Sequence, residues 1–316
     1  MRLFLLTLIL FVTYAFGSIE RLPEFRVTSA DIQNLVNSLR RKDVNKAKAN
    51  QIRVNYQGHT TTRNFQDDAA NRLFTHVDSA LLRKDTYRKL SALMDNYIRQ
   101  TGQVERVTRQ EEREENEFLD AVLATDVMRT LYQFLNRKRH AYARNQTTFK
   151  AKLKQLWFGR YSRARGVADT SGFEHVFIGE SKNSQIGGMH NWLRFYTLEK
   201  DARARFDYKG FLVKRFNIMA AVKFTWQNEL KKSGTFMIGI SPEFDFALYT
   251  LCFLSHHRNR DVCSVDIDGC PMAITSHVIS QQGKVFIGSA YPSAGRMTAE
   301  CRNKNSGRRQ HRRYEH

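Results

Sequence analysis

The chain has 316 residues, of which 51 are Lys or Arg and 31 are Asp or Glu, so its formal net charge is +20. A charge of this size creates a positive field that attracts polyanions such as nucleic acids, sulfated glycans or anionic membranes. Four cysteines are too few to hold a chain of this length as a disulfide scaffold, so a hydrophobic core must stabilise the fold. The basic residues cluster at 40–42, at 137–139 and in the tail from 302 to 313.

The first 17 residues have the pattern of a secretory signal peptide. Arg2 precedes an apolar run from Leu3 to Phe16, and cleavage is expected close to Gly17. The run is shorter than the span of about 20 residues that a transmembrane helix needs, and no other segment is a candidate, so we expect no stable membrane insertion. These features predict a soluble, secreted protein, in which the sequon at Asn145 can carry a glycan.

The region that follows is predicted to be helical from about residue 28 to residue 165. Thr28 and Ser29 can cap a first helix, and Gly102 is expected to stop a second. Apolar residues recur at helical spacing in three stretches: Ile32, Leu35, Val36 and Leu39; Leu90, Leu93, Met94, Tyr97 and Ile98; and the longer run from Phe118 to Leu135. These stripes are interpreted as core-facing rather than as binding surfaces.

Two histidines lie close together in the middle of the chain. Apolar alternation from His175 to Glu180 and from Asn191 to Tyr196 predicts two strands, with turns at 182–184 and 187–188. Such a hairpin can bring the imidazoles of His175 and His190 to one surface, where they can act as a general base and a general acid. Taken alone the pattern is weak, because histidines in strands are more often ordinary polar residues.

Strands are predicted to dominate from about residue 170 to residue 294. One helix interrupts them, with Ser241 as its N-cap and Pro242 at its first position. The expected strands are Phe206–Val213, Met219–Trp226, Phe236–Ile240, and the hairpin that joins His277–Ile279 to Lys284–Ile287. Helices first and mostly antiparallel strands later give an α+β fold in a single unit.

The cysteine positions leave the disulfide pairing open. Cys263 and Cys270 flank a short polar segment and can bridge in an oxidising compartment, whereas Cys252 sits in an apolar run and is expected to be a buried thiol. Four cysteines allow three pairings. The last segment, residues 295–316, is polar and basic and is predicted to be disordered.

Several long motifs, in order along the chain, resemble the EndoU family of poly(U)-specific endoribonucleases. They are Gly172–Glu180, His190–Tyr196, Ser241–Leu251 and Ile287–Pro292, with further similarity at Leu93–Tyr97 and Asn116–Ala121. The resemblance extends from about Thr28 to Ser293 and implies a family-like domain over residues 18–294. It also implies the same helical lobe and antiparallel catalytic part.

The resemblance implies that three residues carry the chemistry. His190 is expected to be the general base, His175 the general acid, and Lys231 the cation that stabilises the transition state. The lysine position follows a Phe-x-Trp motif, and Lys232 beside it leaves some ambiguity. The implied reaction cleaves single-stranded RNA at uridine by attack of the ribose 2'-OH, which leaves a 2',3'-cyclic phosphate.

Substrate selection in the family depends on a hydroxyl and a tyrosine, which correspond here to Ser289 and Tyr291. The family motif has Thr where this chain has Ser289, so the hydroxyl is kept and the methyl group is lost. Tyr291 can pack against the ribose or the uracil, although a core tyrosine at a strand end would look the same. Ser241 is a further candidate for contact with uracil, but helix capping already explains it.

Two carboxylates flank the first histidine. Glu174 and Glu180 can orient the imidazoles and raise their basicity, or hold a divalent cation. Family members are similar in responding to Mn or Ca ions, so a divalent cation, with Mn preferred, is expected as a cofactor. The sequence contains no hard-cation loop, and metal ligands are left unassigned.

Two other classes of function remain open from the sequence. A basic secreted glycoprotein can bind RNA or sulfated glycans without any catalysis, and the protein is expected to be a monomer in either case. A metal hydrolase built on His175, His190 and a glutamate is the other alternative, but the His-Glu-x-x-His pattern of zinc peptidases is absent.

Overall fold

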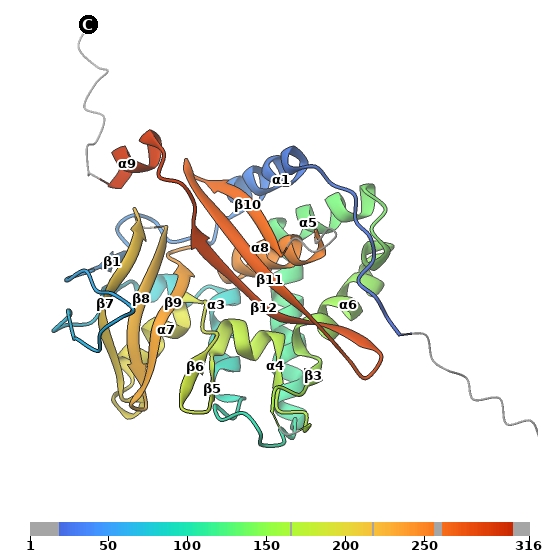
Figure 1. Ribbon diagram of the computed structural model, residues 1–316. Helices are drawn as coiled ribbons and strands as arrows, with labels where there is room; N and C mark the ends of the chain where they lie inside the picture. Colours follow the sequence, from blue (N-terminus) through green and yellow to red (C-terminus); the bar gives the residue numbers. More distant parts are fainter. Residues whose placement is uncertain (1–18, 165, 217, 256–260, 306–316) are drawn as a thin grey trace, which may run out of the picture.

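The computed structural model describes residues 19–164, 166–216, 218–255 and 261–305 (Figure 1). The predicted signal peptide at 1–17 and the end of the tail at 306–316 lie outside the described residues. Within the described part, no helix is both long and apolar enough to span a bilayer.

Helices fill the first half of the chain, as predicted. They are α1 (Ser29–Lys42), α2 (Ser79–Leu82), α3 (Asp85–Ala92), α4 (Arg109–Leu123), α5 (Asp126–Arg137) and α6 (Gln146–Phe158), with short 3-10 turns at Leu93–Asp95 and Ala141–Ala143. Thr28 caps α1 in a capping box with Asp31. The long apolar run divides into α4 and α5 because Thr125 caps a new helix, its hydroxyl accepting from the N–H of Met128.

The strands form two main sheets. The larger has the order β5-β6-β9-β8-β7, in which only β6 and β9 are parallel, and the smaller is the antiparallel sheet β10-β11-β12. Their bounds are β5 (Glu180–Lys182), β6 (Gln185–Gly187), β7 (Phe206–Arg215), β8 (Met219–Trp226), β9 (Glu229–Met237), β10 (Val262–Ile267), β11 (Cys270–Gln281) and β12 (Lys284–Ala294). Two short pairs stand outside them: β1 (Ile52–Val54) with β2 (Phe74–Val77), and β3 (Arg160–Tyr161) with β4 (Thr170–Ser171). The result is the expected α+β fold.

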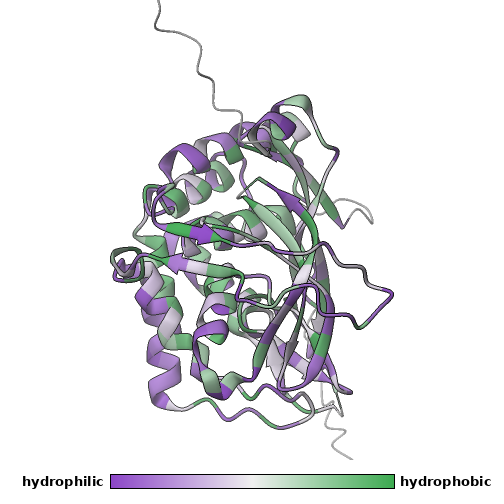
Figure 2. Ribbon diagram, turned by 90° about the vertical axis from the view of Figure 1, so that its left-hand side faces the viewer, coloured by the Kyte–Doolittle hydropathy of each residue, from purple (hydrophilic) through white to green (hydrophobic). Residues whose placement is uncertain are grey.

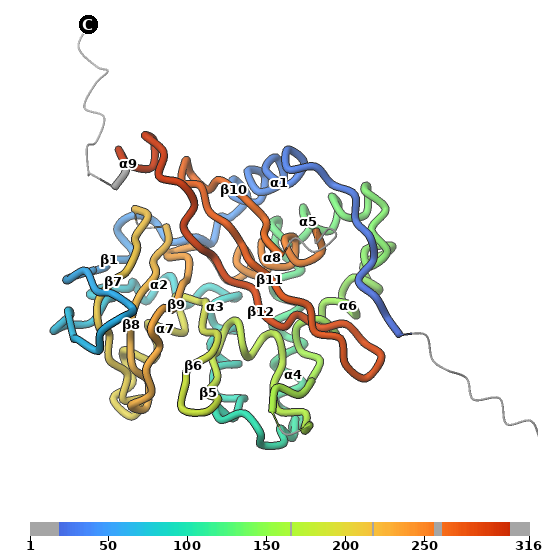
Figure 3. The backbone as a smooth tube through the Cα atoms, in the orientation of Figure 1, coloured from blue at the N-terminus to red at the C-terminus, as the bar shows by residue number. Residues whose placement is uncertain are grey.

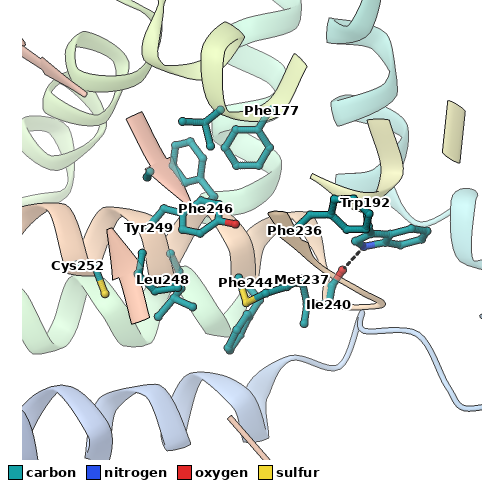
Figure 4. Close-up of a cluster of buried hydrophobic side chains, with 14 of the residues drawn as sticks. Phe177, Trp192, Phe236, Met237, Ile240, Phe244, Phe246, Leu248, Tyr249 and Cys252 are labelled. Atoms are coloured by element: carbon teal, nitrogen blue, oxygen red, sulfur yellow. Dashed lines mark hydrogen bonds between the residues drawn. The ribbon is translucent and has the colours of Figure 1, made fainter. Parts of the chain in front are cut away.

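The core is centred on helix α8 (Pro242–Leu254), in which every residue is buried. Ser241 caps this helix and Pro242 occupies its first position, as predicted. Aromatic rings from the helices and from the large sheet meet around it, and the indole N–H of Trp192 donates to the carbonyl oxygen of Ile240 at 2.9 Å (Figure 4). Figure 2 shows hydrophobic residues on the faces where helices and strands meet, with hydrophilic residues over the outer helices.

Strand β12 crosses the middle of the molecule, between the large sheet and the helices (Figure 3). It contacts β9 and also the helical turn that contains His175. Strand β12 of the small sheet, strand β9 of the large sheet and the turn Glu174–Ile178 therefore lie next to one another.

Two predicted strands around the histidines are wrong. Residues Glu174–Ile178 form a single π-helical turn, and Trp192–Lys200 form helix α7. Apolar alternation over five or six residues does not separate a strand from a short helical segment, and here Asn191 acts as an N-cap that starts the helix. The turn at 182–184 is confirmed, since Asn183 and Ser184 at positive φ join β5 to β6.

The sequence left the disulfide pairing open, and the structure corrects the expectation that Cys252 is a buried thiol and that Cys263 can bridge to Cys270. The bridges are Cys252–Cys263, between α8 and β10, and Cys270–Cys301, between β11 and helix α9 (Ala299–Asn305). Cys252 is therefore not a free thiol, because folding places the end of α8 beside β10. The second bridge holds α9 in place, so the first part of the predicted disordered tail, up to residue 305, is ordered.

Candidate active site

The π-helical turn fixes the two histidines relative to each other. The carbonyl oxygens of His175 and Val176 accept hydrogen bonds from the N–H groups of Met189 and His190, at 2.9 and 2.6 Å. The chain passes so close at Gly188 that a Cβ there would lie 1.7 Å from the carbonyl oxygen of His175. The two imidazole centroids are 6.5 Å apart, so the predicted meeting of the two rings is found even though His175 lies in a helical turn and His190 in the irregular segment before α7.

His175 is held by a carboxylate. Its Nδ1 lies 2.7 Å from Oε1 of Glu180. The same oxygen forms an ion pair with Nε of Arg163 at 2.9 Å, while Oε2 accepts from the hydroxyl of Thr170 at 2.6 Å. Burial acts to raise the pKa of Glu180, but these partners outweigh burial and lower it to about 2. Glu180 is therefore ionised near neutrality, so His175 donates from Nδ1 and leaves Nε2 available.

Burial and the nearby charge of Arg163 lower the pKa of His175, against the opposing effect of Glu180. The imidazole is therefore neutral in the free protein at neutral pH. A phosphate group bound beside it would favour the imidazolium, because a nearby anion stabilises the protonated form. Glu180 would then stabilise that charge from the other side of the ring.

His190 is deeper in the site and is only 6% exposed. Its Nδ1 lies 2.7 Å from the carbonyl oxygen of Thr235 on β9, and since a carbonyl only accepts, Nδ1 carries the proton and Nε2 the lone pair. Burial, reinforced by the charge of Lys231, lowers the pKa of His190 well below its usual value. His190 is thus a neutral imidazole with a free basic nitrogen.

Lys231 on β9 is the lysine that belongs to the site. Burial lowers its pKa to about 8, with Glu180 opposing the shift, and its charge acts on both imidazoles. Lys232, beside it in the sequence, is exposed. Of the two lysines, Lys231 is therefore the one whose charge acts on the imidazoles, whereas Lys232 lies at the solvent-exposed surface.

The residues proposed to select the substrate separate into two groups. Tyr291 on β12 stacks against His190, with ring centroids 5.2 Å apart, and Ser289 lies two residues before it in the same strand. Ser241, in contrast, is completely buried, and its hydroxyl accepts from the N–H of Phe244 at 3.2 Å. Ser241 is a helix cap, and the structure does not bring its hydroxyl to the imidazoles.

The two carboxylates also differ. Glu180 contacts His175, whereas Glu174 is fully buried beside Glu105 and Arg160. Burial, reinforced by the charges of Glu105 and Glu180 and opposed by Arg160, raises the pKa of Glu174 well above its usual value. Glu180 orients an imidazole, and Glu174 belongs to the core beneath the turn.

Arg163 is a site residue that the sequence did not reveal. Besides Glu180, its guanidinium donates to the hydroxyl of Tyr161 at 2.8 Å and to the carbonyl oxygen of Gly288, the residue before Ser289. It thereby joins the histidine side of the site to β12. An isolated arginine in a chain with 51 basic residues gives no signal that marks it.

The donor set of the site does not form a cation cage. Within the residues that the structure describes, no group of three or more His, Cys, Asp or Glu side chains is arranged to hold a metal ion. The oxygens of Glu180 already contact an arginine, a hydroxyl and an imidazole. The expected divalent cation remains a prediction without assigned ligands.

The predicted glycosylation residue lies at the surface. Asn145 is exposed at the start of α6, and its side-chain oxygen accepts from the N–H of Thr148 at 2.7 Å. The amide nitrogen, which would carry a glycan, takes no part in that hydrogen bond.

Two neutral imidazoles, whose Nε2 atoms have no hydrogen-bond partner among the described residues, one carboxylate and one ammonium group define an acid–base site on an α+β fold. Comparison with known proteins assigns the family: the model of endoribonuclease XendoU matches residues 31–292. The chain is also similar to the structure titled "The structure of XendoU: a splicing independent snoRNA processing endoribonuclease", with a TM-score of 0.71, 33% identity, and coverage of 84% of this chain and 97% of the other. The chain belongs to the XendoU family.

Curated relatives carry names that describe their specificity. The chain is 38% identical to the uridylate-specific endoribonucleases of Bos taurus and Homo sapiens, over 84% of its own length and 65% and 66% of theirs. It is 37% identical to uridylate-specific endoribonuclease D of Xenopus laevis, covering 84% of this chain and 89% of the relative. The chain therefore spans just under two thirds of the bovine and human proteins and most of the Xenopus protein.

Proposed function

We propose that this protein is an endoribonuclease that cleaves single-stranded RNA at uridylates and leaves 2',3'-cyclic phosphate ends. The observation that carries the proposal is the pair His175 and His190, whose rings are 6.5 Å apart and whose Nδ1 atoms are both occupied. Each imidazole thus offers its Nε2 to a phosphodiester placed between them. The names of the relatives support uridylate as the site of cleavage.

His190 acts as the general base. As the neutral, buried imidazole it takes the proton from the ribose 2'-OH at Nε2, and the resulting oxygen attacks the adjacent phosphorus. The carbonyl oxygen of Thr235 accepts from Nδ1–H and keeps the ring in this tautomer and orientation.

His175 acts as the general acid. The bound phosphate and Glu180 favour its imidazolium form, which donates the Nε2 proton to the departing 5'-oxygen as the phosphorus–oxygen bond breaks. Lys231 supplies positive charge to the crowded phosphorane-like transition state. The products are a 2',3'-cyclic phosphate on the uridine and a free 5'-hydroxyl on the next nucleotide.

Tyr291 and Ser289 bind the uridine. The Tyr291 ring stacks on His190 at an interplanar angle of 28° and can pack against the ribose or the base, and the Ser289 hydroxyl can form a hydrogen bond with uracil.

The proposal also covers the setting of the enzyme. The signal-peptide pattern at 1–17, the exposed sequon at Asn145 and the two disulfides support a secreted, glycosylated protein, and we propose that it is a monomer. Stimulation by a divalent cation, Mn before Ca, is proposed from the family resemblance, and none of the steps above is routed through the metal.

The decisive experiment is cleavage of a short single-stranded RNA that contains one uridine, by the wild type and by His190→Ala, with and without Mn ion, with analysis of the product ends. Cutting 3' of the uridine with a cyclic phosphate end, lost in His190→Ala and kept in the surface control His76→Ala, is the expected result. Tight RNA binding with no cleavage under any metal condition would instead favour a basic binding protein without catalysis.

A further inference from the structure

A cavity adjoins the site beside His175. Its volume is about 520 Å³, and its lining includes His175, Arg163, Asn183, Gln185, Gly187 and Ile279. It lies between the β5–β6 hairpin and strand β11.

Of the residues given a role in catalysis or uridine binding, His175 lines this cavity together with Glu180, which holds its Nδ1. His190, Lys231, Ser289 and Tyr291 are absent from its walls. The cavity therefore opens beside His175 along the β5–β6 hairpin, and Ile279 at its other wall lies against Gly288 of β12. The cavity is open up to the imidazole because Gly187 has no side chain: a Cβ there would lie 3.4 Å from Cε1 of His175.

The reaction determines what must occupy that side. A general acid has to come within about 2.6–3.2 Å of the atom that it protonates. In the proposed mechanism that atom is the 5'-oxygen of the nucleotide after the uridine. The nucleoside that carries this oxygen must then lie beside His175, where the cavity begins.

The lining suits a nucleoside. Ile279 and the buried Ile186 offer apolar surface to the face of a base, and the side-chain amides of Asn183 and Gln185 can donate to and accept from its edge. Among the described residues, neither amide has a hydrogen-bond partner, and both side chains are exposed at the hairpin. The volume falls within the range of about 300–1,000 Å³ typical of small-ligand sites.

We propose that this cavity is a subsite for the nucleoside directly 3' of the cleaved bond, and that Asn183 and Gln185 bind its base. This inference rests on the proposed function, because it uses His175 as the general acid. Amides recognise the edges of all four bases, so the subsite increases the rate for any nucleoside in that position rather than selecting a single base.

The test compares two substrates. Uridylyl-3',5'-adenosine has a nucleoside after the cleaved bond, and the methyl ester of uridine 3'-phosphate has only a methyl group. The double variant Asn183→Gly/Gln185→Ala keeps a residue that tolerates positive φ in the turn. The control is Asn228→Gly, in the β8–β9 turn, where Asn228 is also exposed at positive φ but lies outside the cavity.

We expect the double variant to lower kcat/KM for the dinucleotide about tenfold, as expected for the loss of one or two hydrogen bonds, and to leave the methyl ester within about twofold of wild type. Asn228→Gly should change neither substrate. Equal losses on both substrates, no loss on either, or a wild type that cleaves both substrates equally well would each overturn the subsite. A wild type that cleaves neither substrate would instead remove the proposed function itself.

Discussion

The backbone N–H of His190 donates to the carbonyl oxygen of Val176 at 2.6 Å. In an α-helix that carbonyl would be taken by the N–H four residues later, but the π-helical turn ends at Gly179, at a φ of 88°, and leaves it free. This one irregular turn thus contains His175 and also holds the backbone of His190 through the Val176 carbonyl. The proposed pairing of His175 with His190 therefore depends on a π-helical turn, which is a departure from regular α-helix geometry.

Replacement of Gly188 by Ala should separate the two imidazoles. The new Cβ would lie 1.7 Å from the carbonyl oxygen of His175, so the backbone must move and the Met189 and His190 hydrogen bonds must lengthen. We expect loss of cleavage by at least about 100-fold, because displacement of reacting groups by about 1 Å can cost that much. Single-turnover cleavage of a uridine-containing RNA measures the effect.

Gly283→Ala is the matched control for that variant. Gly283 also has a positive φ, 71°, but its Cβ would meet nothing within 4 Å. It should therefore share the conformational strain and keep the activity. Equal loss of activity in both variants would mean that strain alone, and not displacement of the histidines, explains the first result.

Glu180→Gln should weaken His175 as the general acid while leaving the fold intact. The amide cannot stabilise the His175 imidazolium as the carboxylate does, so we expect kcat to fall at least about 100-fold while the circular dichroism spectrum is kept. Glu199→Gln is the control, since Glu199 is a buried glutamate that accepts from the N–H groups of Leu73 and Phe74 outside the site. A Glu180→Gln protein with normal kcat would show that His175 does not need this partner.

The two neighbouring lysines should behave differently. Lys231→Ala removes the charge that acts on both imidazoles and should lower kcat/KM about 100- to 1,000-fold, as for other groups that stabilise transition-state charge. Lys232→Ala removes an exposed charge and should stay within about threefold of wild type. A larger loss in the second variant would move the catalytic role to Lys232.

The pH profile should decline on its alkaline side near pH 8. The pKa of Lys231 is lowered to about 8, so the side chain is charged below that pH and loses its charge as the pH rises through it. Stabilisation of the transition state should be lost over the same range. Lys231→Arg, whose guanidinium stays protonated, should shift the decline to higher pH, and kcat measured from about pH 5 to pH 10 would test this. An unchanged alkaline limb in the arginine variant would exclude Lys231 as its origin.

Removal of residues 306–316 should weaken RNA binding without slowing turnover. The segment contains four Arg and one Glu. Each phosphate that is no longer neutralised by a basic side chain reduces the salt slope of binding by about 0.7, so the slope should decrease by at most about 3. The cut lies after Cys301 and keeps the disulfide. A decrease in kcat at saturating RNA would contradict a purely electrostatic role.

The sequence predicted the fold class and the capped helices correctly, but it misassigned the local structure around the two histidines. Helical periodicity, the caps Thr28 and Ser241, and Pro242 at a first helical position are local signals, and the corresponding helices formed as expected. The segments around His175 and Asn191 were misassigned because five or six residues contain too little periodicity, and because a π turn depends on tertiary hydrogen bonds from Met189 and His190.

Long-range contacts within the chain could not be predicted. Arg163 reaches Glu180 and Gly288 only because β12 returns beside the π turn, and the pairing of Cys270 with Cys301 depends on where α9 comes to rest. The structure also separated the two lysines, since the partial burial that distinguishes Lys231 from Lys232 is a property of the folded state.

The Cys252–Cys263 bridge would keep a molecule together after a protease had cut the chain between these two cysteines. A proteolytic cut between these two cysteines would divide the chain into one piece with both histidines and Lys231 and another with Ser289 and Tyr291. The bridge would keep the pieces covalently joined, and β11 and β12 would remain packed on the rest of the protein. The nicked protein would behave as one molecule, and even after a reductant broke the bridge, only unfolding would separate the residues proposed to bind uridine from those proposed to cleave beside it.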